Sequence, residues 1–132
     1  MSTIKAAITA VGAYVPDFVL TNKALESMVD TNEEWITSRT GIKERRILKE
    51  EGKGTSFLAI KAAQNLLAKA NVDPLEIDLL IMATATPDMP VASTGAYVAT
   101  EIGATNAFAY DLQAACSSFL FGMSTAAAYI ES

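Results

Sequence analysis

The chain has 132 residues, of which 51% are hydrophobic and 19% charged, and its formal net charge at pH 7 is −5. This length is sufficient for one domain with a core, and the high apolar fraction indicates surface that something else covers. The net negative charge disfavours nucleic acid as a partner, because phosphate binding requires a clustered basic surface. No apolar run is long enough to span a bilayer, so we expect no membrane partner.

Two features favour a cytoplasmic location. The opening MSTIKAAITAVGAYVP lacks the basic start, apolar stretch and cleavage site of a secretory signal. The single cysteine cannot form an internal disulfide, which fits a reducing compartment.

The N-terminal segment is predicted to contain a strand and a short helix. Residues 5–11 form an apolar run, which indicates a buried strand, and Gly12 and Pro16 close it. Asn22 is a favourable N-cap residue, so we expect a short helix that runs to Val29.

A second helix is marked at both of its ends. Thr31 and Glu34 have the T-x-x-E spacing of a capping box, which predicts a helix N-terminus. Gly41 suits the left-handed conformation that commonly ends a helix. Residues 42–48 are then expected to be extended, and the glycines in residues 52–54 mark a loop.

The clearest helix follows that loop, with Thr55 or Ser56 as the expected cap. Its apolar residues recur at spacings of three and four, the pattern of one helix face. These residues are Phe57, Ile60, Ala63, Leu67 and Ala70. Asp73 followed by Pro74 predicts a single helical turn.

The rest of the chain alternates strands and helices. IDLLIMATA, residues 77–85, is a continuous apolar strand, the pattern of a strand buried on both faces. Ser93 caps a helix that ends at Gly103, residues 107–112 form another strand, and an amphipathic helix begins near Ser117. This order predicts an α/β fold with a mainly parallel sheet covered by helices on both faces.

Cys116 lies where the last strand passes into the last helix. The N–H groups and the dipole of a helix N-terminus favour thiolate over thiol. The small neighbours Ala114 and Ala115 leave room for a substrate carbonyl, and the Cys116 N–H can contribute to an oxyanion hole. Loops 84–92 and 113–116 are expected to share one rim of the sheet, where ligands bind in such folds.

Two interpretations of Cys116 remain open on the residues alone. It is either a catalytic nucleophile or a buried packing residue, which is the usual role of a free cysteine. The chain contains no histidine, so a catalytic Cys116 requires partners on sequence outside these 132 residues.

Two segments resemble β-ketoacyl-acyl carrier protein synthase III, a family of thiolase-like condensing enzymes. They are DTNEEWITSRTGIKERR, residues 30–46, and DLQAACSSF, residues 111–119. The second segment indicates only the superfamily, whereas the first is specific. The opening GAYVP and the strand DLLIMATATPD also fall in family order. The resemblance implies a thiolase-like fold, with residues 1–132 as a truncated N-terminal half and the C-terminal half absent.

The resemblance implies fatty-acid chain initiation through an acyl-cysteine. Cys116 would take the acyl group of acyl-CoA, and malonyl-acyl carrier protein would then lose carbon dioxide and attack it. The family's histidine and asparagine, which stabilise the enolate, lie downstream, so this chain alone is expected to be inactive. The family implies a homodimer without metal or cofactor, since acyl-CoA is a substrate. The alternatives are transfer to an acceptor other than the carrier protein, or a non-catalytic structural fragment.

The resemblance also assigns a coenzyme A site. Trp35 matches the tryptophan that stacks on adenine, Arg39 the arginine at the nucleotide end, and Thr31 a threonine beside it. An arginine four residues after a tryptophan lies on the same side of a helix. Without the family, Trp35 would be a packing residue, Arg39 a solvated charge and Thr31 an N-cap. Ser118 stands where the family motif usually has glycine.

Overall fold

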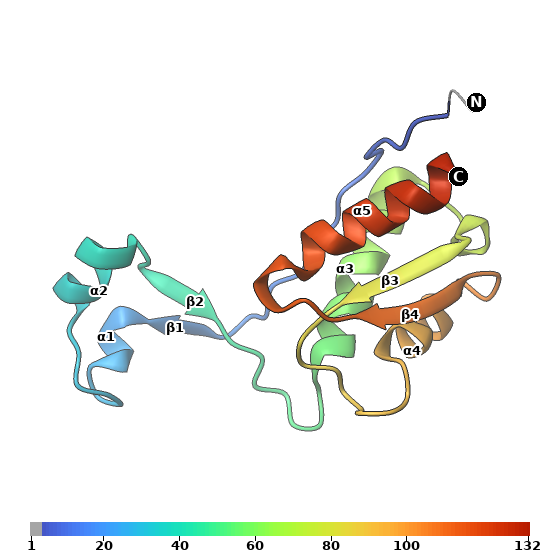
Figure 1. Ribbon diagram of the computed structural model, residues 1–132. Helices are drawn as coiled ribbons and strands as arrows, with labels where there is room; N and C mark the ends of the chain where they lie inside the picture. Colours follow the sequence, from blue (N-terminus) through green and yellow to red (C-terminus); the bar gives the residue numbers. More distant parts are fainter. Residues whose placement is uncertain (1–3) are drawn as a thin grey trace. The chain divides into compact units, whose positions relative to one another are not determined.

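The computed structural model describes residues 4–132, which divide into two units. The larger unit contains residues 54–132 with the N-terminal segment up to Tyr14, and the smaller one is Val15–Lys53. Figure 1 shows the helices and strands of each unit. Over the described residues, no helix combines the length and the apolar character needed to cross a membrane.

A parallel pair of strands organises the larger unit. β3 (Leu79–Ala83) pairs with β4 (Phe108–Leu112), with Ile81 opposite Tyr110. α4 (Thr94–Glu101) connects the two strands, so the segment is a strand-helix-strand crossover (Figure 1).

Helices cover both faces of this pair, as the sequence predicts. A Cβ placed on Gly95 of α4 would lie 3.1 Å from the Cβ of Met82. On α5 (Ser118–Glu131), a Cβ placed on Gly122 would lie 3.9 Å from Cγ2 of Ile81. Because successive strand residues point to opposite faces, α4 and α5 pack on opposite sides. α3 (Thr55–Ala70) packs against α4.

The smaller unit contains an antiparallel pair of short strands. β1 (Val19–Thr21) pairs with β2 (Glu44–Arg46), and α1 (Asn22–Leu25) and α2 (Glu33–Thr40) lie between them in the chain. β2 falls within the stretch predicted to be extended, whereas β1 was not predicted. The fully buried Asn22 holds the unit together, since its Nδ2 donates to the carbonyl of Ile42 at 2.7 Å and to Thr37 Oγ1 at 3.2 Å.

The predicted strand at residues 5–11 is wrong. This segment pairs with neither β3 nor β4, and Ile8 and Val11 are each 69% exposed. The segment instead lies close against α3, since a Cβ placed on Gly12 would lie 2.5 Å from the Cβ of Leu66. A strand requires a neighbouring strand for its backbone groups, whereas here the N–H of Ala6 donates to Glu131 Oε1 and the carbonyl of Val11 accepts from Lys69 Nζ, both of them side-chain partners.

The predicted caps of the first two helices are each wrong by one residue. Thr21, not Asn22, caps α1 by accepting from the N–H of Ala24, and the helix ends at Leu25 rather than Val29. In α2, the Oδ1 of Asn32 accepts from the N–H of Trp35 at 2.8 Å, which replaces the predicted capping box of Thr31 and Glu34. Both helices thus use the polar residue directly before their first turn.

The cap of α3 is also not the predicted one, whereas other helix ends agree with the sequence. Gly54 occupies the N-cap position and supplies no side-chain oxygen, so neither Thr55 nor Ser56 is the cap. The predicted turn at Asp73 is confirmed as η1 (Pro74–Glu76), closed by a capping box between Asp73 and Glu76. Gly41 ends α2 in the left-handed conformation with φ 72°. The cap of α4 is Ser93, as predicted.

Candidate active site

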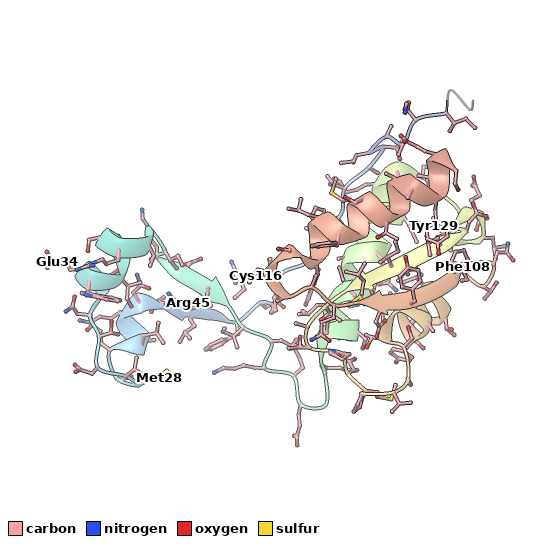
Figure 2. All side chains as sticks on the ribbon, viewed as in Figure 1. Met28, Glu34, Arg45, Phe108, Cys116 and Tyr129 are labelled. Carbon is pink, nitrogen blue, oxygen red and sulfur yellow. The ribbon has the colours of Figure 1, made fainter. Side chains whose placement is uncertain are left out.

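The turn between β4 and α5 presents the single cysteine to solvent. It contains η2 (Ala115–Ser117), a short helical turn that continues into α5, and Cys116 lies in its middle (Figure 2). The Cys116 thiol is free and exposed, which contradicts the buried packing role. Backbone N–H groups in a first helical turn have no intrahelical acceptor. The backbone N–H of Cys116 is therefore suited to donate a hydrogen bond to a substrate carbonyl oxygen.

The residue directly before the cysteine has a strained backbone. Ala115 has φ 47°, and the other non-glycine residue with positive φ in the described chain is Asn71, at the end of α3. For a residue with a Cβ, the left-handed conformation costs about 1–2 kcal/mol. Asparagine is among the residues that tolerate this region, whereas alanine is not. Strain of this kind is retained where the surrounding structure enforces it.

Ser118 makes two hydrogen bonds to the backbone around the strained Ala115. Its Oγ accepts from the N–H of Ala114 at 2.7 Å and donates to the carbonyl of Ala115 at 2.8 Å. The side chain is nearly buried, since Ser118 is 4% exposed. From the sequence, Ser118 is noted only as standing where the related motif usually has glycine, and its hydrogen bonds are not predicted. The missed signal is a serine placed three residues after an alanine in a turn, a spacing that permits side-chain bonds to the backbone.

The C-terminal ends of β3 and β4 lie side by side at one edge of the sheet, as predicted. The N–H of Thr84 donates to the carbonyl of Leu112 at 3.2 Å, so the loops that follow the two strands leave the sheet at the same edge. The first loop is also tied to α3, because both carboxylate oxygens of Asp88 lie 3.2 Å from the N–H of Ser56. This contact supplies the side-chain acceptor that Gly54 lacks.

Asp111 connects the end of β4 to the beginning of α4. Its carboxylate accepts from the N–H groups of Thr94 and Gly95 at 2.9 Å and 2.7 Å, and from Ser93 Oγ at 2.9 Å. Burial acts to raise the pKa of this carboxyl, but the hydrogen bonds from Gly95, Thr94 and Ser93 together outweigh it and lower the pKa below its usual value. The strand that leads to Cys116 is therefore anchored at its C-terminal end.

The proposed coenzyme A residues lie on and beside α2. Trp35 is 54% exposed, and the Arg39 guanidinium lies 5.7 Å from the centre of its ring. Thr31 precedes Asn32, the cap of α2, and is half-buried. The structure thus brings Trp35 and Arg39 together in the smaller unit, whereas Cys116 belongs to the larger one.

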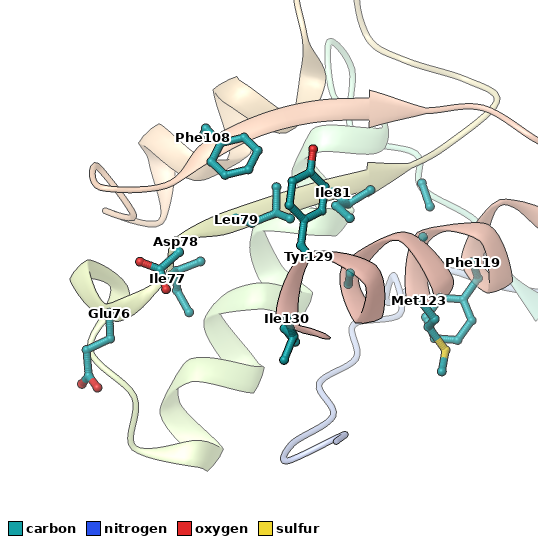
Figure 3. A pocket seen from close by; sticks show the side chains of 13 residues that line it. Glu76, Ile77, Asp78, Leu79, Ile81, Phe108, Phe119, Met123, Tyr129 and Ile130 are labelled. Carbon is teal, nitrogen blue, oxygen red and sulfur yellow. The ribbon is translucent and has the colours of Figure 1, made fainter. Parts of the chain in front are cut away.

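An apolar groove of about 720 Å³ runs between α5 and the strands of the larger unit (Figure 3). The ring of Tyr129 on α5 reaches Phe108 on β4 in an edge-to-face contact, with 5.7 Å between ring centres. Burial raises the pKa of the Tyr110 hydroxyl, and the neighbouring Tyr129 raises it further. Cys116 does not line this groove.

Within residues 4–132, no group of three or more histidine, cysteine or acidic side chains is placed to hold a metal ion.

The chain was compared with family models and with the sequences of curated proteins. No family model matches the chain. It is 54% identical over 132 residues to beta-ketoacyl-acyl-carrier-protein synthase III 2 of Bacteroides thetaiotaomicron, covering 100% of this chain and 39% of the relative. It is 55% identical to the synthase III of Phocaeicola vulgatus, covering 100% of this chain and 40% of the relative.

Solved structures show the same likeness. The crystal structure of 3-oxoacyl-acyl-carrier-protein synthase III from Aquifex aeolicus matches with a TM-score of 0.89 and 45% identity, over 96% of this chain and 40% of that one. The synthase III from Thermus thermophilus matches with a TM-score of 0.88 and 45% identity, over 96% of this chain and 39% of that one. The chain thus spans 39–40% of the length of these curated relatives. Over its whole sequence, the chain is similar to members of the β-ketoacyl-acyl carrier protein synthase III family.

Proposed function

We propose that this chain is part of a condensing enzyme that forms a carbon–carbon bond through an acyl group held on Cys116. The observation that carries the proposal is the exposed thiol of Cys116 at the start of a helix, directly after the strained Ala115. The names of the relatives, which are synthases acting on an acyl carrier protein, support the same activity.

In the first half-reaction, the Cys116 thiolate attacks the thioester carbonyl of an acyl-CoA. The N–H of Cys116 donates to the oxygen as it becomes negative, which stabilises the tetrahedral intermediate. The carbon–sulfur bond to coenzyme A then breaks, and coenzyme A leaves as its thiolate. The acyl group remains on the Cys116 sulfur.

In the second half-reaction, malonyl-acyl carrier protein supplies the carbon nucleophile. Loss of carbon dioxide leaves the electron pair on the carbon next to the thioester, and this carbon attacks the acyl-cysteine carbonyl. The Cys116 thiolate is released and the product is a 3-oxoacyl thioester of the carrier protein. The enolate requires hydrogen-bond donors, and the family's histidine cannot come from this chain, which contains none. These donors belong to the rest of the protein.

The coenzyme A end of the substrate is assigned to α2. The exposed face of Trp35 offers a stacking surface for adenine, and the neighbouring Arg39 charge suits the phosphates of the nucleotide. Thr31 completes this proposed subsite, because it precedes the helix on which both residues lie. The exposure of Trp35 and Arg39 supports binding roles over packing.

The proposal is tested with the complete protein that carries this segment. Incubation with acyl-CoA should add the mass of one acyl group to Cys116, and addition of malonyl-acyl carrier protein should yield carbon dioxide and the 3-oxoacyl product. Cys116→Ala should abolish both the adduct and the product, whereas Ser117→Ala should retain them. Undiminished product formation by Cys116→Ala would contradict the proposal.

Two further results separate the alternatives. An adduct that passes to another acceptor without release of carbon dioxide would identify an acyltransferase instead. Residues 1–132 alone should give no sustained product formation, because a thiolate supplies the nucleophile but not the stabilisation of the enolate.

A further inference from the structure

We infer that Ser118 is a positioning residue, which holds the turn before Cys116 in the conformation required for acyl transfer. The inference rests on the proposed role of Cys116 as the nucleophile. It concerns a side chain that is hydrogen-bonded to the backbone of Ala114 and Ala115 and that acts on Cys116 through this backbone.

The geometry points to a specific mechanical role. The Ser118 hydroxyl bonds to groups on both sides of the Ala115 Cα, namely the N–H of Ala114 and the carbonyl of Ala115 itself. The same carbonyl also accepts the backbone N–H of Ser118. A single nearly buried side chain therefore fixes the peptide group that precedes Ala114 and the one that follows Ala115, so the backbone between them, which includes φ and ψ of Ala115, is restrained at both ends.

This restraint opposes a relaxation that the chain would otherwise favour. Ala115 at φ 47° is less stable than in the ordinary right-handed or extended regions. Return of Ala115 to negative φ would rotate the following peptide, which carries the Cys116 N–H, and would redirect the sulfur. An attack that depends on orientation is sensitive to such shifts, and a misplacement of about 1 Å costs about 100-fold in rate.

Ser117 supplies a matched control in the same turn. It is exposed and forms no side-chain bond to the helix start. Its hydroxyl has the same chemistry as that of Ser118 but does not restrain Ala115. A difference between Ser118→Ala and Ser117→Ala therefore reports on the hydrogen bonds rather than on loss of a serine.

The experiment measures single-turnover acylation of Cys116 by acyl-CoA in the complete protein. Ser118→Ala should lower the rate at saturating acyl-CoA by about 10- to 100-fold and leave the half-saturating concentration unchanged. Ser117→Ala should match the unsubstituted protein. Alkylation by iodoacetamide should proceed in all three proteins, because the thiol remains exposed and a small reagent makes little demand on orientation.

A second substitution tests whether the effect passes through Ala115. Glycine adopts positive φ without the steric cost of a Cβ, so Ala115→Gly should recover at least part of the acylation rate when added to Ser118→Ala. A residue that merely stabilised α5 would give no such recovery. The double variant also relieves the strain, so the test remains available if Ser118→Ala alone folds poorly.

The outcomes separate this inference from the proposed function. If the unsubstituted protein forms no acyl-cysteine, the proposed function fails and the inference fails with it. If Cys116 is acylated but Ser118→Ala behaves as Ser117→Ala, or if Ala115→Gly restores nothing, the inference alone is overturned.

Discussion

At the scale of single residues, Cys116 lies in a turn in which Ala115 has positive φ and the Ser118 hydroxyl is hydrogen-bonded to the backbone. The strand and the helix around Cys116 are evident from apolar runs and periodicity, and the thiol lies at their junction. The positive φ of Ala115 has no sequence signal, because alanine is an unfavourable residue for that region. The two bonds of Ser118 depend on the local path of the backbone, which composition does not specify.

Trp35 provides a prediction for the coenzyme site. If its exposed ring stacks on adenine, Trp35→Ala should weaken acyl-CoA binding by about 1–3 kcal/mol, as for other base–aromatic contacts. The acylation rate at saturating acyl-CoA should change little, because the lost contact is remote from the thioester. Trp35→Phe retains an aromatic face and should lose less affinity. Titration with acyl-CoA measures the effect, and an unchanged affinity in Trp35→Ala would leave this side chain with no role in binding.

At the scale of elements, success of the sequence prediction follows the strength of the local pattern. α3 presents the predicted apolar face, and β3 is the predicted continuous apolar strand. β1 and β2 carry no such pattern, since β2 is the charged tripeptide ERR, and their pairing joins segments far apart in sequence. Residues 5–11 have the composition of a strand, yet a strand also requires a partner edge, which local sequence does not encode.

Asp111 gives a prediction at this scale, because it joins β4 to α4. Its carboxylate has a pKa lowered by the hydrogen bonds from Gly95, Thr94 and Ser93. A lowered folded-state pKa means that the stabilisation is present above the ordinary carboxyl pKa and is lost as pH falls through the folded-state pKa. Asp111→Asn should therefore destabilise the complete protein at neutral pH by about 1–3 kcal/mol, since it loses charge-assisted hydrogen bonds.

The measurement is the free energy of unfolding in denaturant at neutral and acidic pH. The difference between the unsubstituted protein and Asp111→Asn should shrink as the solution is acidified. Glu101→Gln is the matched control, because Glu101 is an exposed carboxylate at the end of α4, and it should change stability little. A difference for Asp111→Asn that is independent of pH would show that the anchor does not depend on the carboxylate charge.

At the scale of the whole molecule, the described surface is unusually apolar. Phe119, Leu120 and Phe121, at the start of α5, are 71%, 66% and 58% exposed, and the groove beneath the same helix is lined mainly by apolar side chains. Each strand of the β3–β4 pair has one edge without a partner among the described strands. Open edges and contiguous apolar patches favour association with other protein surfaces.

We therefore predict that a polypeptide of residues 1–132 does not persist in solution as a compact monomer. It should dimerise, aggregate, or become ordered only beside further protein. We propose that the complete protein is a homodimer joined at β4, an expectation that comes from the family resemblance. Burial of the exposed α5 side chains and pairing of the open edges are the physical reasons, since both remove groups from an unfavourable environment.

Light scattering and amide hydrogen exchange on the pure 132-residue chain test this prediction. We expect a mass above that of the monomer, or fast exchange in β3 and β4 wherever the chain remains monomeric. The charged substitution Leu120→Lys should reduce association if the exposed face of α5 drives it, whereas Lys61→Arg, on the exposed side of α3, should have no effect. A monodisperse monomer with strongly protected amides in both strands would show that the two units bury enough surface by themselves, and that the exposed face of α5 tolerates water.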